Sequence, residues 1–278
     1  MRIGIATDNY RLQNRPLEYC LDHIAKIGCK FAELNMIHGF EFFEGLGFTP
    51  NVSNFEDPLR IRDMVEKRGI TISQCCCHYP LWSYRCVDYM RMGILFADQL
   101  GCEAIATTDS DKLPAGMSEE DAFVLMKHHL GEVLKFAERH KIKVLLEPHG
   151  KLTNHPDKMK RLVTCHDSEL LGINFDTGNT FVCGWEPQEF LAKLINKVHH
   201  CHVKDVAPEL AGERRGEDTG IASSDVYVGE GVNADNIIEC LKVFKKNNYK
   251  GILSLECGGE ALTEKSFTWL TQQVNELK

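Results

Sequence analysis

Short runs rich in Ile, Val and Leu alternate along this sequence with longer stretches in which apolar residues recur at helical spacing. This alternation is typical of parallel β-strands joined by crossover helices. Eight strands are predicted, at Arg2–Thr7, Phe31–Asn35, Thr71–Cys77, Ala104–Thr108, Val144–Glu147, Gly172–Asp176, Val198–Val203 and Ile252–Glu256. Eight strand–helix units predict a (β/α)8 TIM barrel, and a doubly wound open sheet is the alternative fold.

Local signals set the ends of several predicted helices. Asp57-Pro58 opens a helix that ends near Gly69, and Ser118 with Asp121 forms a capping box for a helix that ends near His140. Pro187 is expected in the first turn of another helix. The final helix, Thr263–Leu277, would close the outer ring.

One long irregular insert interrupts this pattern after the seventh strand. It covers about residues 207–232 and carries five glycines between Pro208 and Val232. In a barrel, a long loop after a strand lies over the active-site mouth, where it can act as a lid or as a partner surface. Because no linker is apparent, residues 1–278 are expected to form a single barrel with this one insert.

Composition excludes several classes of protein. With 32 Lys plus Arg against 40 Asp plus Glu, the formal net charge is −8, which argues against a nucleic-acid binder. The apolar stretches fall short of the ~20 residues that span a bilayer, and the first ten residues read as a strand, so no membrane partner is expected. The 12 Cys contain no CxxC pair and favour reduced thiols in a cytoplasmic enzyme.

Ionisable side chains stand at nearly every predicted strand end. They are His78, Asp109, Glu147 with His149, Asp176, His202 and Glu256. A single carboxylate or imidazole of this kind is usually a hydrogen-bonded structural group. Because the carboxyl ends of barrel strands converge, several of them together predict an active site.

The charges at these strand ends predict a bound cation. Glu147, Asp176 and Glu256 would bring three negative charges into one mouth beside His202, which is unfavourable unless a cation neutralises them. Three oxygen ligands and one imidazole suit Mn²⁺ or Mg²⁺ first, with Co²⁺ and Zn²⁺ as alternatives. Cys75–Cys77 cannot all face one ion, because neighbours on a strand point to opposite faces, and they are expected to pack in the core.

Several motifs together resemble the xylose isomerase-like barrel superfamily of sugar isomerases, ketose 3-epimerases and inosose dehydratases. They are LLEP ending at residue 148, NFDTGN at residues 174–179, HVKD at residues 202–205, the GEG turn at residues 229–231 and SLEC at residues 254–257. The resemblance implies a single divalent ion, Mn²⁺ by preference, on Glu147, Asp176, His202 and Glu256. His200 lies on the same strand face but outside the HxKD pattern, so it is the less favoured ligand.

The residues around His149 favour one branch of this superfamily. The motif EPHG, at residues 147–150, resembles the corresponding segment in the catalytic subunits of bacterial C-glycoside deglycosidases, which act on 3-keto-glycosides. That resemblance implies that His149 removes the C2 proton and that β-elimination then cleaves the glycosidic bond. In the ketose 3-epimerases the two ligand glutamates, here Glu147 and Glu256, exchange the proton instead, and His149 would then only orient Glu147 or a water.

Further residues are assigned to substrate binding. Glu33, at the end of the second strand, and His78 are expected to bind sugar hydroxyls, and Trp82 to stack on a sugar ring. Asp109 and Lys204 complete this set. Asp205 is expected to orient His202, and Arg214 and Arg215 are either anion contacts or solvated loop charges.

The predicted partner is a keto sugar or a glycoside, with two hypotheses for its conversion: a 3-keto-glycoside lyase, which is favoured, and an epimerase or isomerase. A non-catalytic sugar-binding barrel is the alternative from another class. The net charge of −8 speaks against an endonuclease acting on abasic DNA. Resemblance to the deglycosidases also implies a small β-sandwich-like partner subunit, and a homo-oligomer is the alternative assembly.

Overall fold

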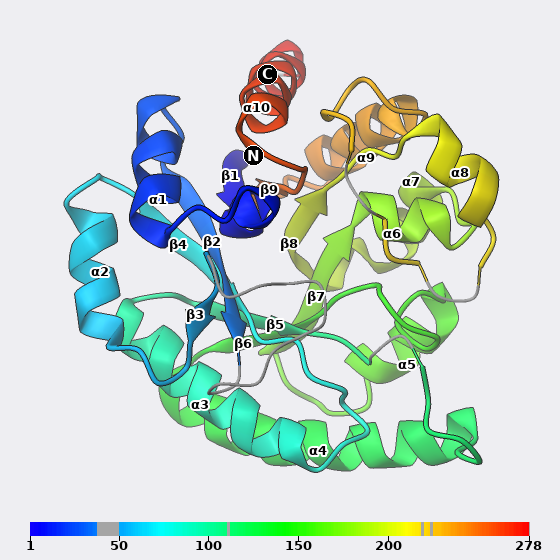
Figure 1. Cartoon of the computed structure of the whole chain (residues 1–278). Helices are drawn as coiled ribbons and strands as arrows, with labels where there is room; N and C mark the ends of the chain where they lie inside the picture. The colour runs from blue at the N-terminus through cyan, green and yellow to red at the C-terminus, as the bar shows by residue number, and fades with distance from the viewer. Residues whose placement is uncertain (38–49, 110–111, 218–219, 223–224, 278) are drawn as a thin grey trace.

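The computed structural model describes residues 1–37, 50–109, 112–217, 220–222 and 225–277. Eight parallel strands form a closed barrel (Figure 1), namely β1 Arg2–Ala6, β2 Phe31–Ile37, β4 Thr71–Cys76, β5 Ala104–Thr107, β6 Lys143–Leu146, β7 Leu171–Asp176, β8 Val198–Val203 and β9 Ile252–Leu255. The first strand pairs with both β2 and β9, which closes the sheet. The predicted (β/α)8 barrel is thereby confirmed, and the open sheet is excluded.

Helices surround the barrel on the outside (Figure 1). They are α1 Leu17–Lys26, α2 Pro58–Glu66, α3 Arg85–Leu100, α4 Glu119–His140, α5 Pro156–Val163, α6 Thr177–Val182, α7 Pro187–Leu194, α8 Pro208–Arg214, α9 Ala234–Lys246 and α10 Glu260–Glu276, with 3-10 turns η1 Thr7–Gln13 and η2 Ile195–Lys197. Asp57 caps α2 through the Leu59 N–H, and the Ser118–Asp121 capping box is formed on α4. No described helix has the length and apolar character needed to cross a bilayer.

The three consecutive cysteines show how the core is divided. Cys75 and Cys77 belong to the large apolar cluster between strands and helices, where an added Cβ on Gly93 of α3 would lie 2.6 Å from the Cys77 sulfur. Cys76 belongs to a small separate cluster with Ala104, Ala106 and Leu145. It therefore faces the barrel interior, as the alternation of side chains along a strand requires. All 12 Cys are free thiols.

One strand and two short helices lie outside the sequence prediction. The two-residue strand β3, Val52–Ser53, pairs with the end of β2, which itself extends two residues beyond the predicted Asn35. The short helix α6 begins directly after β7 and is buried throughout. The insert after β8 contains α8, while its residues 218, 219, 223 and 224 lie outside the described part of the chain.

Candidate functional site

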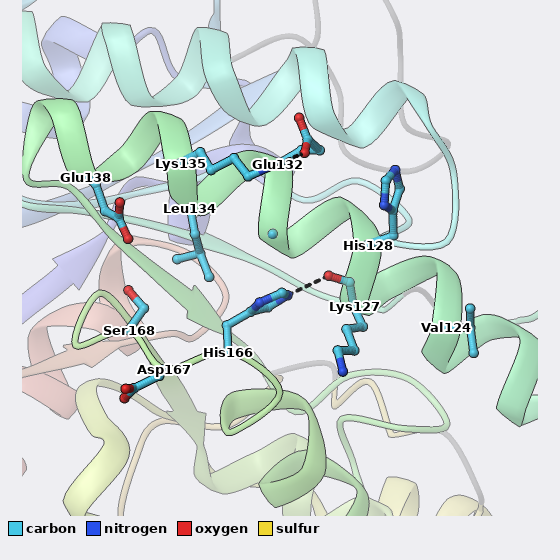
Figure 2. Close-up of a pocket in the computed structure, with 11 residues that line it drawn as sticks. Val124, Lys127, His128, Glu132, Leu134, Lys135, Glu138, His166, Asp167 and Ser168 are labelled. Carbon is cyan, nitrogen blue, oxygen red and sulfur yellow. Dashed lines mark hydrogen bonds and ion pairs between the residues drawn. The ribbon is translucent and has the colours of Figure 1, made fainter.

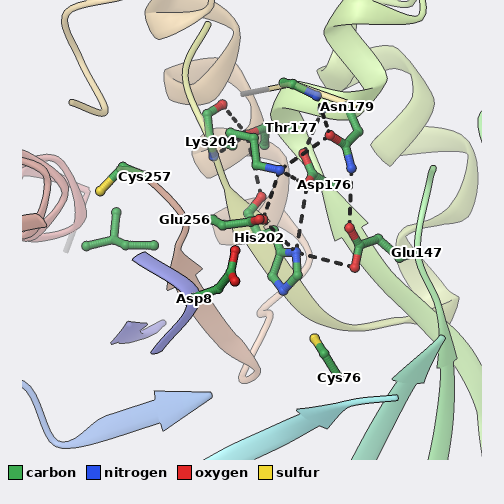
Figure 3. A network of polar contacts seen from close by, with 12 residues as sticks. Asp8, Cys76, Glu147, Asp176, Thr177, Asn179, His202, Lys204, Glu256 and Cys257 are labelled. Carbon is green, nitrogen blue, oxygen red and sulfur yellow. Dashed lines mark hydrogen bonds and ion pairs between the residues drawn. The ribbon is translucent and has the colours of Figure 1, made fainter. Parts of the chain in front are cut away.

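Four side chains from neighbouring strand ends converge at the barrel mouth (Figure 3). Glu147 directly follows β6, Asp176 ends β7, His202 is the penultimate residue of β8 and Glu256 directly follows β9. One ligand atom from each lies within 4.8 Å of the corresponding atoms of the other three. The structure thus brings together the four residues that the sequence nominated as metal ligands.

His202 is central to this cluster. Its Nδ1 atom lies 3.1 Å from Glu256 Oε2, 3.4 Å from Glu147 Oε2 and 3.7 Å from Asp176 Oδ2. Lys204 joins the same group, with its Nζ atom 3.2 Å from Asp176 Oδ2 and 3.0 Å from Glu256 Oε2. The carboxylates therefore alternate with two groups that can carry positive charge.

In this cluster, attraction between opposite charges shifts the pKa values more strongly than burial does. Burial alone would raise the pKa of Glu147, but the charges of His202 and His78 hold that pKa well below its usual range. Burial likewise opposes ionisation of Glu256, and Lys204 and His202 outweigh it, lowering the pKa to about 2. The same carboxylates raise the pKa of His202 and of Lys204 against the opposing effect of burial. The carboxylates of Glu147 and Glu256 and the basic groups of His202 and Lys204 therefore stabilise one another's charged forms.

The donor set fits a divalent cation. Among the described residues, four carboxylates, those of Glu33, Glu147, Asp176 and Glu256, face His202 and Lys204. Asp176 uses Oδ1 to accept the Asn179 N–H at the start of α6, while its buried Oδ2 faces the mouth and lies 3.2 Å from Lys204 Nζ. Carboxylate oxygens with one imidazole nitrogen are ligands suited to Mn²⁺, Mg²⁺, Co²⁺ or Zn²⁺.

Two imidazoles flank one side of the cluster. His78 Nε2 lies 3.1 Å from Glu147 Oε2, and the His78 side chain keeps 28% of its surface exposed. The ring of His149 lies beside that of His78, with 5.7 Å between their centres. His149 is therefore placed next to a residue that touches a candidate ligand.

Asp109 holds the segment that carries His149. Its buried carboxylate accepts the Leu152 N–H at 2.7 Å and the Thr153 hydroxyl at 2.5 Å. The Thr153 oxygen in turn accepts the backbone N–H of His149 at 3.0 Å and of Gly150 at 3.1 Å. The expectation that Asp109 binds substrate is corrected accordingly, because its carboxylate is occupied by the loop after β6.

Three other residues assigned to substrate binding have different surroundings. Glu33 is not at a strand end, because β2 continues to Ile37, and it lies 2% exposed with Oε1 2.7 Å from His202 Nε2. Lys204 is 3% exposed and contacts carboxylates of the cluster. Trp82 is partly buried against the apolar core. Only His78 and Trp82 of the predicted substrate contacts keep partly exposed side chains.

The residues predicted around the insert stabilise the loop itself. Asp205 does not orient His202. Its carboxylate accepts four backbone N–H groups, from Val206, Gly229, Gly231 and Asn233. Arg214 pairs with Glu217, and Arg215 pairs with Glu186. These two arginines therefore have protein partners in place of an anion.

Two asparagines connect the cluster and were not singled out from the sequence. Asn174 on β7 donates to Glu147 Oε2 at 3.0 Å. Asn179 donates to Glu147 Oε1 at 3.3 Å and accepts the Ala222 N–H of the insert at 2.9 Å. Both lie in the NFDTGN motif. Asn174 is two residues before Asp176 and so on the same strand face, which is the signal that the sequence offers for it. Asn179 lies on α6, which the sequence pattern does not predict.

A separate surface pocket of about 490 Å³ lies on the outside of the barrel (Figure 2). Its described lining residues come from α4 and from residues 166–168, and His166 Nε2 hydrogen-bonds the Lys127 carbonyl there at 2.7 Å. None of the predicted site residues lines this pocket. The chemistry-bearing residues are instead gathered at the barrel mouth.

The fold and the site together define a (β/α)8 barrel with a carboxylate–imidazole centre at the carboxyl ends of its strands. A family model described as xylose isomerase-like TIM barrel matches residues 21–273. The chain belongs to this family. The family resemblance stated from the motifs is thereby confirmed.

The curated relatives have low sequence identity to this chain. The chain is similar to an inosose dehydratase of Clostridium botulinum, with 26% identity over 141 residues, or 49% of this chain and 47% of that protein. It thus spans about half the length of the curated relatives it matches.

Solved structures share the fold along the whole chain. A D-tagatose 3-epimerase-like protein has a TM-score of 0.76 at 22% identity and 99% coverage of both chains. The IOLI protein with a bound zinc atom has a TM-score of 0.76 at 14% identity, covering 100% of this chain and 99% of that one. The 3-keto-D-glucoside 4-epimerase YcjR of E. coli has a TM-score of 0.73 at 14% identity, covering 98% and 99%.

Proposed function

We propose that this protein is a divalent-metal-dependent enzyme that removes the proton next to the carbonyl of a keto sugar. The favoured outcome is β-elimination that cleaves a 3-keto-glycoside, including a C-glycoside. The observation that carries the proposal is the four-residue donor cluster with His78 and His149 on one side of it. Similarity to an inosose dehydratase and to a 3-keto-D-glucoside 4-epimerase supports keto-polyol chemistry at this site.

The roles of the residues follow from their positions. Glu147, Asp176, His202 and Glu256 hold the ion, which when bound supplies Lewis-acid polarisation of a substrate ketone and so acidifies the neighbouring C–H. His149 removes the proton from C2 of a 3-keto sugar. The electron pair released forms the C1–C2 double bond while the bond from C1 to the leaving group breaks, and the leaving group takes a proton from water. His78 and Trp82 bind the sugar.

The identity of the ion belongs to the same proposal. Mn²⁺ is preferred because three carboxylates dominate the donor set. Zn²⁺ is the alternative supported by the bound zinc of the IOLI protein, which has the same fold. Mg²⁺ and Co²⁺ fit the same ligands.

A ketose epimerase is the second candidate. Glu147 and Glu256 approach His202 Nδ1 at 3.4 and 3.1 Å from different strands, so two carboxylates border the proposed ion position from different sides. In this reaction one carboxylate removes the proton from one face, and the other returns a proton to the opposite face. The likeness to a D-tagatose 3-epimerase-like fold agrees with this alternative.

Incubation in deuterium oxide separates the two reactions. The metal-loaded protein is given a 3-keto-glycoside or a free ketose, and the products are identified by NMR and mass spectrometry. The lyase proposal expects release of the aglycone from the 3-keto-glycoside. Deuterium incorporation with epimerisation of the ketose, and no aglycone release, would replace it with the epimerase.

Metal content tests the ligand assignment. His202→Ala and Glu256→Ala should each lose the stoichiometric ion that the wild-type protein retains after dialysis, measured by plasma mass spectrometry. His200→Ala is the matched control, because His200 lies two residues away on the same strand and bonds Asn174 at 2.9 Å. Full occupancy in both ligand variants, or loss of the ion in the control alone, contradicts the assignment.

A further inference from the structure

We propose that Glu33 is a positioning residue that orients His202 for metal binding from inside the barrel. The inference rests on the proposed metal site and assigns to Glu33 a role different from sugar binding. It is carried by the contact between Glu33 Oε1 and His202 Nε2, which are 2.7 Å apart.

The two nitrogens of His202 have separate surroundings. Nδ1 faces the three mouth carboxylates, of which Glu256 is nearest at 3.1 Å. Nε2 points the opposite way, to Glu33. A neutral imidazole carries one proton, and a carboxylate at Nε2 retains the proton there. The lone pair of Nδ1 is then directed at the ion position.

Glu33 is suited to this role because it is itself held in place. Its Oε1 atom accepts from Gln74 Nε2 at 2.9 Å and from the Cys76 thiol at 2.7 Å, besides His202. Gln74 is the register partner of Glu33 on the adjacent strand β4. All three side chains lie inside the barrel with 5% exposure or less. Three hydrogen bonds to the same oxygen therefore fix the position of Glu33 Oε1.

Other groups near His202 do not supply an equivalent acceptor. Asn174 Nδ2 lies 3.2 Å from His202 Nε2, but an amide NH₂ cannot accept a proton, and it donates to Glu147 Oε2. His200 Nε2 is directed to Ser73 Oγ at 3.2 Å. Asp205, the acidic residue near His202 in sequence, is occupied by backbone N–H groups. Glu33, 169 residues away in sequence, is the acceptor that the fold supplies.

The test compares Glu33→Ala and Glu33→Gln with Ser254→Ala. Glu33→Gln keeps the size of the side chain and one acceptor oxygen. Ser254 is the β9 register partner of His202 and is fully buried. Its hydroxyl has no hydrogen-bond partner among the residues that the structure describes, so its removal controls for a change in the barrel interior. Circular dichroism melting identifies variants that fold, and Glu33→Gln keeps the test available if Glu33→Ala does not.

Mn²⁺ and Zn²⁺ affinities are measured by calorimetry with the folded proteins. Loss of the orienting carboxylate should raise Kd about 10- to 100-fold, the usual effect of removing the partner of a metal-ligating histidine. Glu33→Gln should lie between Glu33→Ala and wild type, while Ser254→Ala stays within about threefold of wild type. Wild-type Kd in folded Glu33→Ala, or in folded Glu33→Gln where Glu33→Ala does not fold, overturns the proposal.

A second readout separates this inference from the metal site itself. In metal-free protein labelled with ¹⁵N-histidine, His202 should show an Nε2–H proton protected from exchange, assigned by its absence from His202→Ala. Folded Glu33 variants should lose that protection, and unchanged protection overturns the inference. If the wild-type protein binds neither ion, the proposed metal function fails, while this signal still decides whether Glu33 orients His202.

Discussion

Glu147 is the most constrained carboxylate of the candidate site, and this bears on which group removes a proton. Its carboxylate oxygens accept hydrogen bonds from His78, Asn174 and Asn179. Its pKa is held low, despite burial, by the positive charges around it. A carboxylate that already accepts several hydrogen bonds is a weak base. Imidazole is the side chain whose ordinary titration range lies near neutral pH, which favours His149 as the proton acceptor in the lyase reaction.

His149→Ala is predicted to separate binding from chemistry. The variant should retain the ion and bind substrate within a few-fold of wild type, because His149 is not among the converging ligands. Turnover should fall by about 10² to 10⁴, the usual contribution of a positioned general base, and exchange of the C2 proton with solvent deuterium should be lost. Steady-state kinetics and NMR in deuterium oxide measure both effects.

His128→Ala, an exposed histidine on α4, is the control and should leave both measurements unchanged. Retained exchange in His149→Ala, together with epimerisation of a free ketose, would assign the proton transfer to Glu147 and Glu256.

The sequence could predict which residues reach the mouth but not all of their partners. Strand periodicity and the known end of the barrel locate Glu147, Asp176, His202 and Glu256 without any structure. The contacts of Glu33 and Asp109 are made with segments that are distant in sequence. Glu33 contacts His202, which is 169 residues away, and Asp109 contacts Thr153, which is 44 residues away. Local spacing carries no information about contacts so far apart in sequence, and a prediction from sequence therefore places both residues in the substrate site.

At the scale of elements, prediction succeeded where a periodic pattern was long enough. The eight barrel strands and the capped starts of α2 and α4 carry clear signals. Strand β3 has two residues, too few for an alternating pattern. Helix α6 is buried on all sides and so lacks an amphipathic face, and its start depends on the Asp176 side chain accepting the Asn179 N–H.

The end of the insert is predicted to depend on Asp205. Asn at this position keeps one acceptor oxygen for the four backbone N–H groups and turns an NH₂ toward the others. Asp205→Asn should therefore lower the free energy of unfolding by about 2–3 kcal/mol, since hydrogen bonds to a charged acceptor are lost. Urea unfolding followed by circular dichroism measures it.

Glu213→Gln on the exposed face of α8 is the control, and it removes a carboxylate from the same insert without touching this turn. Equal stability of Asp205→Asn and wild type would show that the turn at residues 229–233 forms without the carboxylate.

At the scale of the whole molecule, the assembly remains a prediction from resemblance. We expect a hetero-oligomer with a small β-sandwich-like subunit, in which the insert Pro208–Val232 takes part, and a homo-oligomer otherwise. Val232 at the end of that insert is 46% exposed, so an apolar side chain is available for contact. Light scattering of the chain, alone and with the product of a neighbouring small gene, measures the assembly, and a stable active monomer contradicts it.

The stability of the whole barrel should also depend on the metal ion. Three carboxylates at the barrel mouth and that of Glu33 inside the barrel face His202 and Lys204, so the native state carries excess negative charge that a bound cation neutralises. An ion that binds only the native state at 100 times its Kd stabilises it by about 2.7 kcal/mol. For a chain of this size, that corresponds to a rise in Tm of roughly 5 °C.

Calorimetry of chelator-treated protein with and without added Mn²⁺ measures this rise. His202→Ala, which lacks the central ligand, should show no such rise over the same concentrations, because its remaining carboxylates bind the ion too weakly. A rise of equal size in His202→Ala would place the stabilising ion elsewhere on the molecule. An unchanged Tm in wild type, with Zn²⁺ also without effect, would contradict a metal centre that spans β6 to β9, since any ion held by four strand ends must resist their separation.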